Sequence, residues 1–155
     1  HYDFTAFDIQ HFLTHLQQYR QRPIILGELS FDSELHGMWV PEDDVDYLFV
    51  SGKLLPFHRV HTLLHESAHM LLNHTRIDLS KVFPEALAKA LGIQSPKGHL
   101  RSGDTLDNDD DEEAERFVML IQQRVTEANR LRELYGEPTS LSAMTRYVRP
   151  LDYNR

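Results

Sequence analysis

Hydrophobic positions recur at helical spacing in three segments of this chain. In Asp3–Arg20, and again from about Asp111 to Leu134, apolar residues three or four positions apart lie among polar ones. The segment Phe57–His74 contains no Gly or Pro and is apolar around most of its circumference. An amphipathic helix buries one face, whereas a helix that is apolar on most sides is buried. The pattern therefore predicts a buried central helix that lies between two amphipathic helices in the sequence.

Three short apolar runs between the first two of these helices predict β-strands. They are Ile24–Leu29, Gly37–Val40 and Val45–Val50, and turn residues such as Pro41 and Gly52 bound them. Because only short turns separate these runs, we expect a small three-stranded antiparallel sheet that packs on the central helix. This arrangement is an α+β fold.

The remaining segments are predicted mainly from their composition. Leu79–Leu91 has the composition of a helix, and Pro84 must lie in its first turn or break it. Residues 92–110 are rich in Gly, Pro, Ser, Asn and Asp and predict a long loop, whereas Leu141–Val148 predicts a short helix. The chain has 155 residues and no internal repeat, so we expect residues 1–155 to form a single domain.

The central helix carries the candidate chemistry, in the H-E-x-x-H sequence from His65 to His69. On a helix this spacing puts both imidazoles on one face, about one turn apart, where they can bind one Zn²⁺. Glu66 is then turned aside from the ligand pair, near enough to take a proton from water activated by the metal. The motif is short, but its buried helix and a stripe of further histidines favour the metal site. We therefore predict a zinc hydrolase with ligands His65 and His69 and general base Glu66.

Three more histidines lie on or near this helix. His61, one turn before His65, could form a rival pair with it, but that pair has no acid between its members to activate water. We expect His61 to be a packed helix histidine or a group beside the site. His58 and His74, near the helix ends, are expected to be terminal or surface residues.

A catalytic zinc normally takes a third protein ligand, and the acidic cluster in residues 107–115 is the obvious source. Acids at a helix N-terminus favour the helix dipole and are usually solvated, so we expect most of them to do only that. On a helical wheel Glu112 points away from the apolar arc, while Asp111 and Glu113 lie at its two margins. Asp111 is therefore the favoured third ligand, and Asp110 and Glu113 are less favoured.

The chain resembles the ImmA/IrrE family of zinc metallopeptidases over roughly residues 23–125. The likeness is carried by a Gly-x-Trp-Val segment in the strands, the helix 62–74 around H-E-x-x-H, and the sequence Glu-Glu-Ala-Glu-Arg-Phe at 112–117, in this order. The resemblance implies a zincin-like fold, with zinc held by the two histidines and an acid from the downstream helix.

The family's acidic ligand falls on Asp111, and the acid that supports a ligand histidine falls on Glu115. Asp stands where the family pattern has Glu, which shortens the reach by one methylene, or about 1.5 Å. The helix must therefore approach the histidines more closely, and Glu112 and Glu115 stay alternatives for the third ligand.

The same resemblance implies limited proteolysis of a helix-turn-helix repressor in a bacterial regulatory switch. The alternative is a non-catalytic, metal-containing module that recognises a partner protein. The net charge of -8 argues against direct nucleic-acid binding by phosphate neutralisation. No apolar stretch approaches a membrane span, and the chain contains no cysteine, so we expect a cytoplasmic protein without membrane contact.

Overall fold

The computed structural model confirms the α+β class and describes residues 1–31, 34–102 and 109–136. The predicted helix Leu141–Val148 lies outside these residues. The elements in chain order are a 3₁₀ helix η1 (Phe4–Ala6), α1 (Ile9–Arg20), β1 (Ile24–Leu29), β2 (Leu35–Pro41), β3 (Asp46–Ser51), α2 (Pro56–Leu72), β4 (Ile77–Asp78), α3 (Glu85–Leu91), β5 (Lys97–Ser102) and α4 (Asp109–Tyr135).

Local sequence signals set the ends of the helices. The Asp8 carboxylate accepts a hydrogen bond from the His11 N–H and caps the start of α1. Helix α2 begins with Pro56 in its first turn, where the missing N–H costs nothing. Helix α3 begins only after Pro84, so the predicted helix is broken there. The residues from Leu79 to Phe83 lie outside α3 because proline cannot continue a helix.

The sheet has five strands in the order β1-β3-β2-β5-β4, so the predicted three-stranded antiparallel sheet is wrong. Strands β2 and β3 form the expected antiparallel hairpin, but β1 pairs in parallel with β3. The reason lies in strand pairing. The hairpin turn joins β2 to β3, and β5 occupies the other edge of β2, so the open edge of β3 takes β1.

Strand β5 lies in the segment that was predicted to be a loop. It pairs antiparallel with β2 and, at its beginning, with β4. Its backbone comes so close to β2 that a Cβ on Gly98 would lie 1.8 Å from the carbonyl oxygen of Trp39. Only glycine allows this approach. The loop prediction failed here because Gly and polar residues, read locally, indicate a turn.

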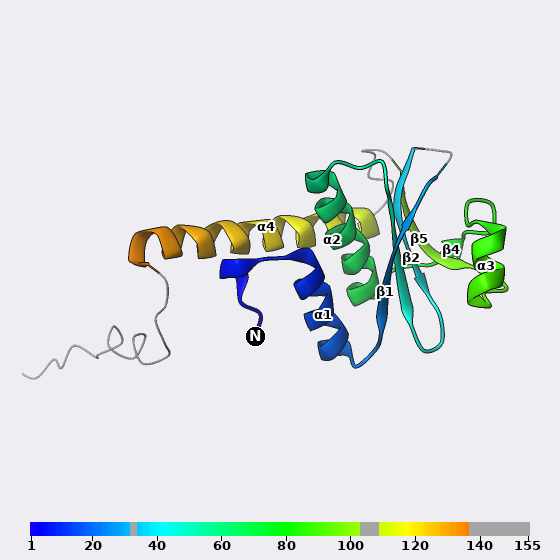
Figure 1. Ribbon diagram of the computed structural model, residues 1–155, viewed down its shortest axis with the longest axis horizontal. Coiled ribbons are helices and arrows are strands. Elements are labelled where there is room, and N and C mark those ends of the chain that lie inside the picture. The colour runs from blue at the N-terminus through cyan, green and yellow to red at the C-terminus, as the bar shows by residue number, and fades with distance from the viewer. Residues whose placement is uncertain (32–33, 103–108, 137–155) are drawn as a thin grey trace, which may run out of the picture.

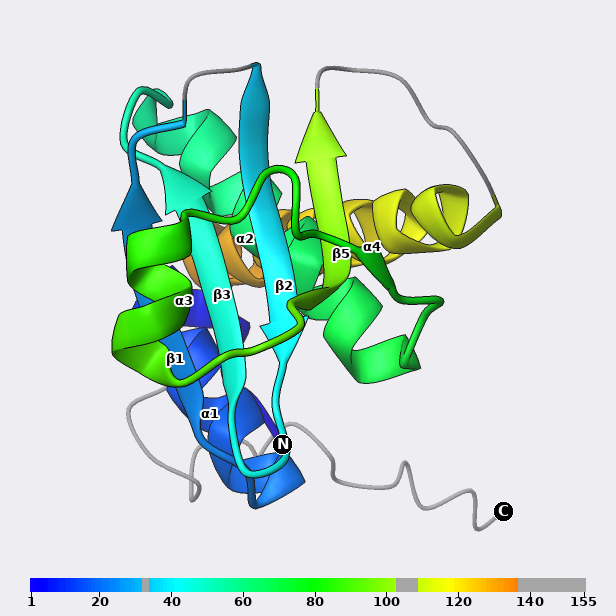
Figure 2. The ribbon, with the colours of Figure 1, turned by 90° about the vertical axis from the view of Figure 1, so that its right-hand side faces the viewer.

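The sheet separates two hydrophobic clusters. Helices α1, α2 and α4 cover one face and α3 covers part of the other (Figures 1 and 2). The first cluster joins α1, α2 and α4 to the sheet and includes Phe12, Leu16, Trp39, Leu48, Leu63, Leu64 and Val118. The second lies beneath α3 and includes Met38, Val40, Phe49, Leu79, Phe83 and Ile93. None of the described helices is long and apolar enough to cross a membrane.

Candidate metal centre

The two histidines of H-E-x-x-H lie deep between the sheet and α4. Every residue of α2 from Thr62 to Met70 is buried, and His65 and His69 are 1% and 0% exposed. Their Nε2 atoms are 3.0 Å apart. One turn of α2 therefore directs two imidazole nitrogens at one small volume, as the spacing of the motif predicts.

Helix α4 brings an acid to the same volume. Its buried residues are Asp111, Ala114, Val118 and Ile121, which recur every three or four positions and form one stripe. This stripe faces α2, so Asp111 is carried inward at its head. The Asp111 Oδ1 atom lies 3.5 Å from His65 Nε2 and 3.4 Å from His69 Nε2. The shorter acid thus reaches the histidines because α4 packs closely on α2.

The spacing of these three atoms fits a zinc ion. For bonds of 2.0–2.1 Å in a tetrahedral site, ligand atoms lie about 3.3 Å from one another. The three separations here are 3.0, 3.4 and 3.5 Å. Two neutral imidazoles and one carboxylate are also a donor set that zinc accepts. The buried group formed with His99 can hold a metal ion, all four ligand atoms lying within 4.8 Å of one another.

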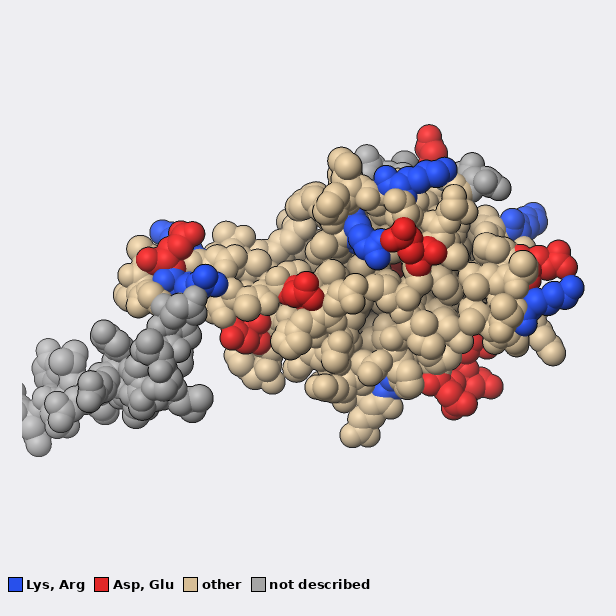
Figure 3. Space-filling view, viewed as in Figure 1, with Lys and Arg blue, Asp and Glu red and all other residues tan. Residues whose placement is uncertain are grey.

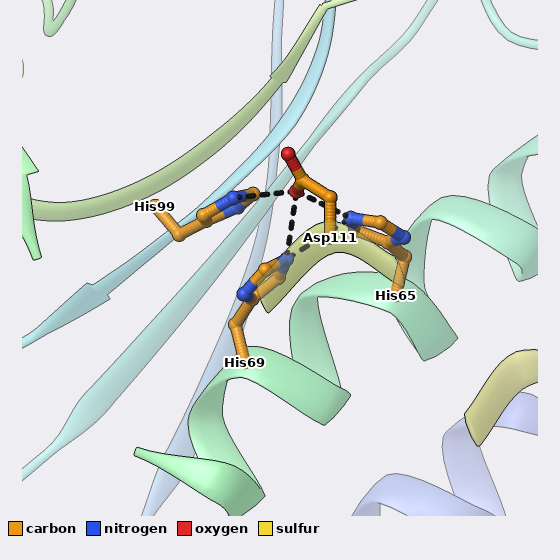
Figure 4. Close-up of side chains that lie close together, drawn as sticks. All are labelled: His65, His69, His99 and Asp111. Carbon is orange, nitrogen blue, oxygen red and sulfur yellow. Dashed lines mark hydrogen bonds and ion pairs between the residues drawn. The ribbon is translucent and has the colours of Figure 1, made fainter. Parts of the chain in front are cut away.

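His99 on β5 is the residue of this group that sequence reasoning missed (Figure 4). Its Nδ1 lies 3.1 Å from Glu66 Oε2, and its Nε2 lies 3.0 Å from Asp111 Oδ1. Side chains alternate along a strand, so His99 faces α2 while Leu100 packs into the opposite cluster. The sequence signal was weak, because the alternation in Lys97–Ser102 extends over only six residues.

The orientation of the His99 ring favours a role beside the other three residues of this group over that of a fourth ligand. Its ring stacks on that of His69, with centroids 3.3 Å apart and planes at 16°. Nitrogen lone pairs lie in the ring plane, so two stacked rings cannot both direct them at one ion. Burial lowers the pKa of His99, but the hydrogen bonds and charges of Glu66 and Asp111 outweigh it and raise that pKa overall. Each nitrogen of His99 thus lies within hydrogen-bonding distance of a carboxylate oxygen that can accept a proton from it.

Glu66 has one carboxylate oxygen in use and one left open. The side chain is fully buried, and Oε2 accepts from His99. The other oxygen, Oε1, has no hydrogen-bond partner among the described residues. A buried polar atom without a partner normally marks the place of a water, an ion or a substrate group. Glu66 thus has a free acceptor beside the ligand set.

Glu115 supports His65 from behind. Its Oε1 lies 2.9 Å from His65 Nδ1 and 3.1 Å from His61 Nε2, and Arg101, whose Nη1 also lies 2.7 Å from His65 Nδ1, donates to the same oxygen. Burial raises the pKa of Glu115, but the hydrogen bonds from Arg101 and His61 outweigh this and lower it to about 2. In the tautomer of His65 that donates from Nδ1 to the Glu115 carboxylate, the neutral ring has its Nε2 lone pair free for a metal.

Burial also favours the neutral form of His65 and His69. Burial is the largest cause that lowers the pKa of His65. Burial, and after it the nearby charge of His99, lowers the pKa of His69 to about 2. A metal-binding imidazole must be neutral, because a protonated one has no lone pair to offer. Both residues therefore meet the chemical requirement for a ligand.

The other acids of the cluster are distributed around α2 and the turn after it. Asp110 accepts from the Thr75 N–H at 3.1 Å, and Glu113 lies 2.9 Å from His74. Glu112 is more than half exposed and pairs with Arg116, away from the histidines. The expectation that most of these acids are only solvated is therefore wrong for Asp110 and Glu113, whereas Glu115 lies against His65, as the family resemblance implies. They are engaged because α4 packs on α2 along its first two turns.

His74 directly follows Asn73, the C-cap of α2, and is thus the terminal residue that was expected. It is not on the surface, however, because it is 8% exposed and its Nδ1 lies 2.9 Å from Nδ1 of His69. His58 is exposed, as expected for a residue near the helix start. The sequence does not reveal the position of His74, because the turn after α2 decides which way this side chain points.

No protein-family model, curated protein or solved structure matches this chain. The resemblance to the ImmA/IrrE family and the zincin-like fold therefore stay predictions. On the face shown in Figure 3, Lys and Arg side chains lie in small groups beside Asp and Glu and form no continuous basic surface.

Proposed function

We propose that this chain is a zinc-dependent endopeptidase. The observation that carries the proposal is the buried Oε1 atom of Glu66, which has no hydrogen-bond partner among the described residues and belongs to the residue next to His65. A purely structural metal site is usually closed by four protein ligands and has no use for such a group. Three ligands and an adjacent free carboxylate oxygen are the composition of a hydrolytic site.

The proposed ligands are His65, His69 and Asp111, and a zinc ion that these three residues held would have room for a water or substrate ligand. Zinc in this place would polarise the scissile carbonyl and make the attacking water more acidic. Glu66 accepts the proton of that water on Oε1 and delivers it to the nitrogen that leaves. Because Glu66 is fully buried, little bulk water competes for its proton.

His99 holds the base in place. Its hydrogen bond to Oε2 fixes the carboxylate of Glu66, so the free Oε1 keeps one direction. Its second hydrogen bond goes to Asp111, so one ring from β5 links the base to a proposed ligand. A group fixed in this way loses little conformational freedom when the reaction begins.

The proposed substrate is a regulatory protein, and a helix-turn-helix repressor is the kind that the family resemblance implies. The zincin-like fold and the role in a bacterial switch belong to the same proposal. A protein substrate is consistent with the mixed surface charge on the visible face, since a nucleic-acid partner favours a continuous basic surface (Figure 3).

The experiment compares the zinc-loaded wild-type chain with Glu66→Gln on a library of internally quenched peptides. Zinc content and fold should be the same in both proteins, because Glu66 is not a ligand in this arrangement. Turnover should fall by about 10²–10⁴-fold, the usual contribution of a general base. Glu112→Gln is the matched control, since Glu112 faces Arg116 on the surface and its loss should leave the rate unchanged.

Two outcomes would contradict the proposal. Equal cleavage by the wild type and Glu66→Gln would remove Glu66 from the mechanism. Full zinc occupancy without cleavage in either protein would favour the alternative, a non-catalytic module that uses the metal centre to recognise a partner.

A further inference from the structure

The turn that ends α2 brings His74 against His69. Asn73 caps the helix in the left-handed region, at φ 52°, a conformation that Asn adopts more readily than most residues. The backbone N–H of His74 then donates to the His69 carbonyl oxygen at 3.0 Å. This turn folds the His74 ring back on the His69 ring, with centroids 4.9 Å apart.

Both nitrogens of His74 have partners. Nδ1 lies 2.9 Å from His69 Nδ1, and Nε2 lies 2.9 Å from Glu113 Oε2. The His74 side chain is 6% exposed, whereas that of Glu113 is 58% exposed. A path of two hydrogen bonds therefore leads from a buried proposed ligand to a solvated carboxylate on α4.

Only one arrangement of protons suits a metal on His69. The metal takes the Nε2 lone pair, so the neutral ring carries its proton on Nδ1. That proton points at Nδ1 of His74, which must then accept it. A neutral His74 carries its own proton on Nε2, where it meets the Glu113 carboxylate, which can only accept. The opposite tautomer would set a bare Nε2 lone pair against this carboxylate.

We propose that His74 and Glu113 are positioning residues that hold His69 in its metal-binding tautomer. The inference rests on the metal centre of the proposed function and extends it to residues outside the ligands and the base. It also gives the two histidines different support, since Nδ1 of His65 lies directly against Glu115, at 2.9 Å from its Oε1. Outer partners of this kind change metal affinity by about 10–100-fold.

The first test measures zinc affinity, by competition with a chromophoric chelator, in His74→Phe and His74→Asn. Phe keeps a ring of similar size but has no acceptor, whereas Asn keeps an oxygen near the position of Nδ1. The relay predicts a loss of about 10–100-fold for His74→Phe and a smaller loss for His74→Asn. A packing role predicts the reverse order, because Phe fills the space and Asn leaves a gap.

Glu113→Gln tests the outer end of the relay. We expect an affinity loss of about 10-fold in the wild-type background and no further loss in the His74→Phe background, because Glu113 acts only through His74. Additive losses would show that Glu113 acts on the site by another route. Glu112→Gln is the control, since its side chain lies on the surface beside Arg116 and should not change the affinity.

The spectroscopic test uses ¹⁵N-labelled histidine in the zinc-loaded protein. His74 should be protonated on Nε2 alone, and a proton on its Nδ1 would overturn the relay. Stoichiometric zinc with unchanged affinity in all three variants would also overturn it while leaving the metal centre intact. A wild-type chain that binds no zinc would overturn both. None of these measurements needs peptide cleavage, so they are independent of the endopeptidase activity.

Discussion

Gly98 is the residue whose substitution tests most directly how the fold builds the site. In Gly98→Ala the new Cβ would lie 1.8 Å from the Trp39 carbonyl oxygen and 2.9 Å from its carbonyl carbon. Both atoms belong to the backbone of β2 and cannot rotate away. Even a tight contact of 3.0 Å requires β5 to withdraw by about 1.2 Å. His99, the next residue, moves with the strand.

The magnitude follows from the contacts that this movement breaks. His99 lies 3.1 Å from Glu66 and 3.0 Å from Asp111, so a withdrawal of about 1.2 Å moves it out of its present alignment with both carboxylates and weakens both hydrogen bonds. A complete loss of either hydrogen bond to a buried carboxylate costs about 1–3 kcal/mol, which sets the upper limit for each contact. With the disturbed pairing of β5 to β2, we expect the free energy of unfolding to fall by about 3–5 kcal/mol, a large part of a typical total.

The assay is urea unfolding followed by circular dichroism, with Gly92→Ala as the control. A Cβ on Gly92 meets no atom within 4 Å, but this residue has φ +71°. Its substitution should therefore cost only the left-handed backbone conformation, about 1–2 kcal/mol. Equal stability of the two variants would refute the steric argument and the close approach of β5 on which it rests.

Three further predictions concern the metal centre. Asp111→Ala should lower zinc affinity by more than the roughly 100-fold that an outer partner contributes. Asp110→Ala removes only an acceptor for the Thr75 N–H and should change zinc affinity little. The chelator competition assay compares the two variants. His99→Phe should keep about one zinc per chain by metal analysis but lower peptide turnover, and loss of the metal would show that His99 is a ligand. Glu115→Gln keeps an acceptor for His65 but removes the charge, so zinc affinity should fall by about 10-fold or less in the same titration.

The sequence by itself determined the parts of the site that depend on one helix. The spacing of His65 and His69 places both rings on one side of α2, because helical geometry is local. The same rule aligned Asp111 with Ala114 and Val118 on the inner face of α4. The α+β class was also accessible, since hydrophobic spacing distinguishes helices from strands.

Only the tertiary structure decided which strands pair and what surrounds the two histidines. Strand order depends on contacts between distant segments, and no local pattern shows that β3 lies between β1 and β2. His99 contacts Glu66 although the two residues are 33 positions apart in the sequence, and the strand that carries His99 has the composition of a loop. His74 reaches His69 because the left-handed turn at Asn73 reverses the chain. These residues meet through backbone geometry and packing between elements, which the hydrophobic spacing of single segments does not contain.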